Sequence, residues 1–317
     1  MNKKYLIAIG IILLLGLFIF DMTSKSQESE KLEDKNSQNS NEFDISKIVS
    51  GGPPKDGIPS IDDPKFVSMG EADNWIEDNE LVLAIIYKGE KRVYPLQILV
   101  WHEIVNDFIA GDPIVITYCP LCGSGIAYER IINGEIVEFG TSGKLYNSNL
   151  IMYDRLTESY WTQIDGIAVT GQLTGTELKE ISIDTVVWRD WKVTHSDSQV
   201  LSQETGFNRN YGNDPYGSYY KNSFTLFPVE NEDDSVHPKT VIFGIEIDGT
   251  YKAYKEEDVI ALQPITDTVA EIKIKITRDE SGIVKIIKVD SDEEIVKERD
   301  FWFAWYAFHP ETQLYQA

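Results

Sequence analysis

The feature that most constrains this chain is a succession of short apolar runs separated by turn-forming residues. Leu81–Tyr87 is a continuous apolar run of the length expected of a buried strand. Lys88-Gly89-Glu90 predicts a turn, and residues 92–94 predict the return strand. Asn133-Gly134 and Asp248-Gly249 are two-residue hairpin signals flanked by apolar runs. The chain is therefore predicted to fold mainly into antiparallel hairpins.

Further strands and a few short helices complete the expected architecture. The additional strands are predicted at 104–109, 114–118, 126–132, 136–139, 150–153, 160–163, 167–170, 240–247, 251–254, 271–277 and 283–289. Pro95 suits the first position of a helix that we expect to reach His102. Trp188 and Trp191, three residues apart, share one face of a second short helix. The predicted fold class is α+β, mostly antiparallel β with a few short helices.

One stretch of the chain resembles another. Ala84-Ile85 with Gly89 and Tyr94 matches Gly244-Ile245 with Gly249 and Tyr254 at one constant offset (244 − 84 = 160). In both, an apolar strand, a Gly turn and a basic return strand ending in Tyr precede a short helical stretch. Two interpretations stay open: two pseudo-repeated hairpin–helix units left by a duplication, or two hairpins that are alike by chance.

The N-terminus carries a targeting signal. Lys3 and Lys4 precede an unbroken apolar run of residues 5–20, which is 16 residues long (20 − 5 + 1). Basic residues before such a run keep the N-terminus cytoplasmic and place the rest of the chain outside. The length lies between those of a signal peptide and a full membrane span. Residues 1–23 are therefore expected to be an uncleaved signal anchor, with a cleaved signal peptide and secretion as the alternative.

The segment after the anchor predicts a tether and then a single domain. Residues 24–46 are rich in Ser, Glu, Lys, Asn and Asp and have almost no apolar content to offset the entropy of ordering. We predict a flexible linker at 24–48 and one extracytoplasmic globular domain at 49–317. The protein is thus expected at the cell membrane, crossing it once, with the C-terminal domain outside the cytoplasm.

Composition excludes several classes of protein. The 317-residue chain has 29 Lys and Arg against 52 Asp and Glu, a net charge of −23. Because nucleic-acid binding relies on clustered basic residues, DNA and RNA are not expected partners. Hydrophobic residues make up 42% of the chain, enough for a substantial core, and two cysteines exclude a scaffold of several disulfides.

The most distinctive string places two cysteines two residues apart, in Tyr118-Cys119-Pro120-Leu121-Cys122-Gly123. This spacing brings two sulfurs close enough to share a metal ion or to form a disulfide. His102, one hairpin upstream, is the expected third ligand. Two thiolates and an imidazole suit zinc or copper, and soft thiolates favour Cu(I). Glu103 is then expected to hold the imidazole in place.

Two other interpretations of the cysteine pair remain open. Cys119 and Cys122 could be a redox-active dithiol, or they could form a structural disulfide or two inert buried thiols. A single C-x-x-C is a weak signal, and neither the βαβ context of thioredoxin nor the following His of c-type haem attachment is present.

Other polar and aromatic strings have simpler interpretations. Gly140-Thr141-Ser142-Gly143-Lys144 could hold an anion, but a hairpin turn is the better interpretation, and Ser142 lacks an assigned base. The aromatic segment of residues 301–306 predicts core packing. The Tyr-rich loop at 211–220 is the expected surface for an envelope protein or polymer, if the chain is a non-catalytic binding module.

Several strings in order resemble one family, the prokaryotic extracytoplasmic proteins catalogued as domain of unknown function 3179. The strings that carry the resemblance are Gly51-Gly52-Pro53, Lys55-Asp56-Gly57-Ile58-Pro59, Tyr94-Pro95, Trp101-His102-Glu103-Ile104-Val105-Asn106-Asp107, Thr117-Tyr118-Cys119-Pro120-Leu121-Cys122-Gly123, Phe139-Gly140, Ser142-Gly143-Lys144-Leu145, Met152-Tyr153-Asp154-Arg155 and Trp161. Thr141 departs from the pattern, where Val is expected. The resemblance implies a single domain from about residue 50 onward and supplies no reaction.

The leading hypothesis from the sequence is a membrane-anchored extracytoplasmic protein that binds copper or zinc through Cys119, Cys122 and His102. The alternatives are a thiol–disulfide oxidoreductase that uses the same cysteines and a non-catalytic module that binds the cell envelope.

Overall fold

Strands and tight turns make up most of the part of the chain that the structure describes. A computed structural model describes residues 43–317; the predicted anchor and all but the end of the linker lie outside these residues. Residues 46–317 form one compact unit. The α-helices in the described part are four to seven residues long: α2 Met69–Ala72, α3 Leu96–Leu99, α4 Trp188–Thr194, α5 Glu256–Leu262 and α6 Trp302–Phe308. Two 3₁₀ helices are η1 Ile45–Lys47 and η2 Gly217–Lys221.

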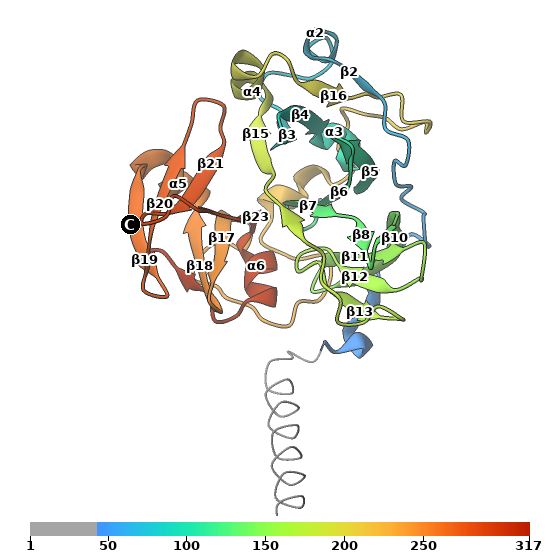
Figure 1. Ribbon diagram of the computed structural model, residues 1–317. Helices are drawn as coiled ribbons and strands as arrows, with labels where there is room; N and C mark the ends of the chain where they lie inside the picture. The colour runs from blue at the N-terminus through green and yellow to red at the C-terminus, as the bar shows by residue number, and fades with distance from the viewer. Residues whose placement is uncertain (1–42) are drawn as a thin grey trace, which may run out of the picture. The chain divides into compact units, whose positions relative to one another are not determined.

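The predicted α+β class is wrong. Five sheets of four or five strands give a β-rich fold in a five-bladed β-propeller arrangement (Figure 1). A helix rises about 1.5 Å per residue, so the longest helices here span only about 10 Å and cannot form a layer over a sheet. The short helices that follow two of the hairpins are attachments to the sheets, and the fold is not built of hairpin–helix units.

Two of the sheets share a strand order. Each has a central antiparallel hairpin, an antiparallel strand beside its first strand and a parallel strand beside its second. One sheet is β15 (Asp184–Val187), β3 (Leu81–Tyr87), β4 (Glu90–Pro95), β16 (Gln199–Leu201) and β2 (Phe66–Ser68). The other is β23 (Glu298–Phe301), β17 (Val241–Ile247), β18 (Thr250–Lys255) and β24 (Gln313–Leu314).

Two more sheets have four antiparallel strands: the second is a meander, and the first is a three-stranded meander with β14 (Glu180–Ile181), from later in the chain, at its edge. The first is β14, β7 (Ser124–Glu129), β6 (Asp112–Cys119) and β5 (Ile104–Ile109). The second is β19 (Ile265–Val269), β20 (Ile272–Arg278), β21 (Val284–Lys288) and β22 (Glu294–Ile295). A tyrosine hydroxyl links each meander to the hairpin before it, because Tyr94 donates to Asp107 at 2.6 Å and Tyr254 donates to Asp267 at 2.8 Å.

The fifth sheet carries the conspicuous Gly-Thr-Ser-Gly string on a bulged strand. Its strands are β1 (Val49–Ser50), β10 (Phe139–Tyr146), β11 (Asn149–Asp154), β12 (Tyr160–Thr162) and β13 (Ala168–Thr170). The β10–β11 register shifts between Thr141 and Lys144, so the two residues between them form the bulge. A separate two-stranded ribbon consists of β8 (Ile131–Ile132) and β9 (Glu135–Ile136) around the predicted Asn133-Gly134 turn.

Buried aromatic side chains hold the sheets and helices together. Trp302 and Trp305 of α6 are 1% exposed and pack on Ile242 and Ala253, which lie on one face of the β17–β18 hairpin. The predicted core role of the aromatic segment at 301–306 is thereby confirmed for its two tryptophans. The Trp305 ring lies so close to Gly244 that an added Cβ would be 2.5 Å from two of its ring carbons.

We therefore expect Gly244→Ala to destabilise the protein by about 1–3 kcal/mol, because the new methyl overpacks a rigid indole. The measurement is urea unfolding. Gly70→Ala is the matched control: Gly70 is exposed on α2 with nothing within 4 Å of its Cβ position, so this substitution should leave stability unchanged or slightly raise it. Equal stability of the two variants would contradict the close Gly244–Trp305 packing.

Candidate functional site

The two cysteines lie on a tight turn between β6 and β7. Cys119 is the last residue of β6 and pairs with Ser124, the first residue of β7. The Cys122 N–H donates to the Cys119 carbonyl at 3.1 Å, which closes a four-residue turn. Gly123 follows at φ +66°, and a Cβ there would be 3.0 Å from the Phe301 ring. The string thus has Gly at this point because both the backbone angle and the neighbouring ring exclude a side chain.

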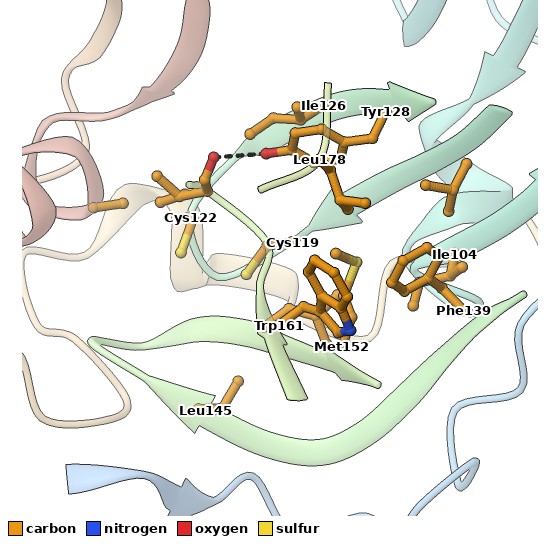
Figure 2. Close-up of a cluster of buried hydrophobic side chains, with 14 of the residues drawn as sticks. Ile104, Cys119, Cys122, Ile126, Tyr128, Phe139, Leu145, Met152, Trp161 and Leu178 are labelled. Carbon is orange, nitrogen blue, oxygen red and sulfur yellow. Dashed lines mark hydrogen bonds between the residues drawn. The ribbon is translucent and has the colours of Figure 1, made fainter. Parts of the chain in front are cut away.

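Both cysteines are free, buried thiols that face one another. Cys119 is 2% exposed and Cys122 is fully buried. Both sulfurs point from the turn toward β10 and β11 (Figure 2), where the Ser148 carbonyl lies 3.5 Å from Cys122 Sγ and 3.9 Å from Cys119 Sγ. The turn therefore brings both sulfurs to one place, as the sequence spacing predicted.

Burial controls the protonation of this pair. Loss of solvent raises the pKa of the Cys122 thiol well above its usual range, and the adjacent Cys119 raises it further. The Asn149 side-chain amide opposes both effects by donating to Cys122 Sγ at 3.5 Å. Cys122 is therefore a neutral thiol at pH 7, and it becomes a nucleophile or a metal ligand only if something removes its proton.

A buried network fixes the amide that contacts Cys122. Asn149 Nδ2 also donates to Gln163 Oε1 at 2.7 Å. The Gln163 amide in turn donates to Thr117 at 3.0 Å and to Ser124 at 3.4 Å. Asn149 and Gln163 are fully buried. Sequence reasoning missed both, because they lie on β11 and after β12, far from the cysteine string in the chain.

His102 is engaged away from the sulfurs. Its Nδ1 lies 2.7 Å from the Pro59 carbonyl and its Nε2 lies 2.6 Å from the Tyr211 hydroxyl. Burial lowers the pKa of this ring to about 4, so the imidazole is neutral at pH 7. Within residues 43–317 no three His, Cys, Asp or Glu side chains are grouped as metal ligands. That the two sulfurs hold copper or zinc, with His102 as third ligand, stays a prediction.

Glu103 occupies an unusual position beside His102. Its backbone has φ +60°, a left-handed conformation that is uncommon for a non-glycine residue. The side chain is 7% exposed, and burial raises its pKa to about 8. Both ring nitrogens of His102 bond to other groups, so the expected Glu103–imidazole contact is not formed. Burial first, and the nearby Glu103 and Cys119 second, raise the pKa of Tyr216.

Tyrosines of η2 and its flank cover the cysteine turn. The Tyr219 hydroxyl donates to the Leu121 carbonyl at 2.9 Å, and the Lys239 ammonium lies 3.7 Å from the centre of its ring. Lys239 is held there because it also donates to the Asn222 and Phe224 carbonyls at 2.6 and 2.7 Å. Part of the Tyr-rich loop that we expected as a binding surface is therefore core, since Tyr219 is 3% exposed.

A cluster of acids, of which Asp300 is fully buried and the others half-buried, lies behind the cysteine turn, and sequence reasoning missed it. Its members are Asp165, Glu180, Glu298 and Asp300. Loss of solvent first, and mutual repulsion second, raises the pKa of Asp165 to about 7 and that of Glu180 to about 8. The same two causes raise the pKa of Glu298 well above its usual range. Burial likewise raises the pKa of Asp300 to about 7. The one signal in the sequence was the two-residue spacing of Glu298 and Asp300, which puts both side chains on one face of a strand.

The other polar strings have structural roles. The Ser142 hydroxyl donates to the Ile151 carbonyl and accepts from the Lys144 N–H at 3.1 Å, so it caps the β10 bulge. Asp154 is fully buried and accepts from the Trp161 indole N–H at 3.0 Å and from the Thr157 N–H. Arg155 contacts Asp62 and Glu138 and does not pair with Asp154.

Comparison with known proteins shows the family. A family model described as a protein of unknown function, domain of unknown function 3179, matches residues 55–312, nearly all of the residues that the structure describes. The chain belongs to this family, as its motifs predicted. No curated protein and no solved structure matches it. Within residues 43–317 no helix has both the length and the apolar character needed to cross a bilayer.

Because its pKa is raised, we expect Cys122 to resist alkylation in the folded protein. In a Cys119→Ser variant, where Cys122 is the remaining thiol, iodoacetamide should react more than about tenfold more slowly without urea than with it. The folded-state rate should keep rising above pH 8.5, where a free thiol levels off. Equal rates in both states would show that the thiol is exposed.

The acid cluster predicts how stability changes with pH. An acid whose folded pKa is raised binds more protons in the folded than in the unfolded state, so stability falls as pH rises between the two pKa values, here from about 4 to about 8. Buried His102 and His309, with pKa values lowered to about 4, act oppositely below pH 6.5. Between pH 6.5 and 8.5 we therefore expect Asp300→Asn to flatten the loss of stability seen in the wild type. Urea unfolding at several pH values measures this, and parallel curves would contradict it.

Proposed function

We propose that this protein is a membrane-anchored extracytoplasmic thiol–disulfide oxidoreductase whose reacting groups are Cys119 and Cys122. The observation that carries the proposal is that one closed turn brings both sulfurs to the same carbonyl oxygen, that of Ser148. A turn with this i to i+3 hydrogen bond holds its end Cα atoms within about 7 Å. A disulfide needs about 4.4–6.8 Å between the same atoms. The turn can therefore accept the oxidised form with little movement of the backbone.

The exchange has a defined order in this proposal. Cys119 reacts first, because Cys122 is the more deeply buried of the two. The Cys119 thiolate attacks one sulfur of an external disulfide, and the first partner thiolate leaves. Cys122 then loses its proton and attacks Cys119 Sγ, which releases the second partner thiolate. The two protons of the dithiol end on the two released thiols, and two electrons pass from Cys119 and Cys122 to the partner disulfide.

Access to the pair depends on its tyrosine cover. Leu121, between the two cysteines, is held by the Tyr219 hydroxyl, and Tyr219 is held by Lys239. An external disulfide reaches Cys119 only when η2 moves off the turn. Access to Cys119 can therefore be tested without changing either sulfur, because Tyr219→Phe removes the hydrogen bond to Leu121 and leaves the ring in place.

The location of the proposed activity rests on the N-terminal residues. The apolar run of residues 5–20 behind Lys3 and Lys4 lies outside the described residues, and it supports an anchor that places the domain outside the cytoplasm. Disulfide exchange suits that location because disulfides persist in oxidising compartments.

The test is equilibration of the full-length protein in glutathione buffers, followed by alkylation and mass measurement. We expect Cys119 and Cys122 to interconvert between dithiol and disulfide at a potential above about −300 mV, the region of labile pairs. The Cys122→Ser variant should trap glutathione on Cys119, because the resolving thiol is gone. Tyr219→Phe should speed exchange without moving the equilibrium potential.

Two outcomes would overturn the redox proposal. One is a pair that stays reduced, or stays oxidised, across the whole buffer range. The other is copper or zinc bound in proportion to the protein in the wild type and lost in Cys119→Ser with Cys122→Ser, with no exchange in the metal-loaded form. That result would favour the metal site predicted from the sequence.

A further inference from the structure

A cavity of about 190 Å³ opens beside the β17–β18 hairpin, away from the cysteine turn. The acidic and aromatic side chains that line it are Glu180, Glu246, Tyr251, Glu298, Trp305 and His309. At about 30 Å³ per water, the cavity has room for about six water-sized groups. It is thus the size of a small organic ion.

Strand register explains why these side chains meet. Glu298 of β23 lies opposite Gly244 of β17, and Asp300 lies opposite Ile242. Tyr251 of β18 lies opposite Glu246 of β17. Residues opposite one another in antiparallel strands share a face, so the acids and Tyr251 stand on the same side of the sheet as the α6 helix. At the centre of this face Gly244 has no side chain, and the Trp305 ring packs over it.

The acids around the cavity lack positive partners. Asp300 is fully buried, and neither of its carboxylate oxygens has a hydrogen-bond partner among the described residues; Glu298 Oε2 likewise has none. The two carboxyls face each other, and the Ser124 hydroxyl also faces Asp300. A buried carboxylate without a partner is costly, so these acids hold on to their protons. A positive group that entered the cavity would allow them to ionise.

The nearest basic side chains are committed elsewhere. Lys297, next to Glu298 in the chain, forms a buried ion pair with Asp184 at 3.0 Å. Arg299 projects to the other side of β23 and pairs with Glu256 at 2.8 Å. His309 Nε2 lies 3.9 Å from Asp165, and burial lowers the pKa of this ring to about 4, so it is neutral at pH 7. Lys297 and Arg299 partly offset the effect of burial on the pKa values of Glu180 and Asp300, but both form their ion pairs with other acids.

Aromatic rings form the opposite wall. Tyr251 and His309 are stacked with their ring centres 4.3 Å apart, and Trp305 lies edge-on to Tyr251 at 6.1 Å. Rings of this kind attract organic cations through their negative faces. Carboxylates on one side and indole, phenol and imidazole on the other are a combination suited to an alkylammonium group rather than to a bare metal ion.

We propose that this cavity binds a small organic ammonium ion, with Glu298 giving up its proton to become the principal counter-charge and with Tyr251 and Trp305 as the aromatic wall. The proposal does not depend on the cysteines, since every residue that carries it lies on β17, β18, β23 and α6 or at their border with β14.

The test uses choline as the probe and the full-length protein. Binding is followed by calorimetry and by the fluorescence change of Trp305 and its neighbours. The matched probe is 3,3-dimethylbutan-1-ol, which has the shape of choline without its charge. We expect choline to bind at least about tenfold more tightly than the neutral alcohol, and Glu298→Gln to weaken choline binding by about tenfold or more.

A control variant and a folding measurement keep the result interpretable. Glu257→Gln removes an acid whose side chain is 75% exposed on α5, outside the cavity, and should leave choline binding unchanged. Urea unfolding of Glu298→Gln should show a protein at least as stable as the wild type, because a neutral amide of the same shape replaces a carboxyl that is costly to ionise in this place. No choline binding by the folded wild type would overturn the proposal. So would equal affinity for the neutral alcohol, or tighter, Glu298-dependent binding of Ca²⁺ or Mg²⁺.

Discussion

The contact on which the rest of the arrangement depends is the one between Phe301 and the cysteine turn. The Phe301 N–H donates to the Cys122 carbonyl at 2.8 Å, and its ring covers the position where Gly123 has no side chain. This contact joins β23, an edge strand of one sheet, to the β6–β7 turn of another. It holds the turn in the shape that brings Cys119 and Cys122 together, and it places Asp300 directly behind them. A change at Phe301 would therefore disturb both sites at once.

Some buried polar groups of the protein have hydrogen-bond partners, and others have none. Each of the five fully buried tryptophans gives its indole N–H to an acceptor, namely Asp154, Asp73, Ser198, Asp233 and Thr312 for Trp161, Trp188, Trp191, Trp302 and Trp305. The large indoles of the core thus have acceptors. Among the described residues whose buried polar atoms lack a partner, Asp300 stands out because both of its carboxylate oxygens are unpartnered, and such a group calls for an explanation.

Local features of this protein could be predicted from its sequence because they depend on local chemistry. The β3–β4 hairpin, the Asn133-Gly134 turn and the closeness of Cys119 and Cys122 follow from periodicity, turn residues and spacing. The α+β class was wrong because helix signals say little about length: a helix was expected from Pro95 to His102, yet α3 ends at Leu99. The backbone then turns through the left-handed conformation at Glu103 to begin β5.

The partners of the candidate site could not be predicted, because only the fold brings them together. Asn149 and Gln163 contact Cys122 and Ser124 from the neighbouring sheet, and neither belongs to a motif that indicates a thiol partner. His102 shows the converse. It is close to the cysteines in the chain and has the right chemistry, yet Pro59 and Tyr211, from two distant loops, occupy both of its nitrogens.

The two sites are electrically linked through Asp300. Its negative charge helps to raise the pKa of Cys122, so it disfavours the thiolate that disulfide exchange requires. Any group that neutralises the acid cluster, whether a proton or an ammonium ion in the cavity, therefore makes the Cys122 thiolate easier to form. By linkage, a thiolate at Cys122 makes the cavity more attractive to a cation in the same measure. The buried acids are then what allows a cavity on one sheet to influence a dithiol on the next.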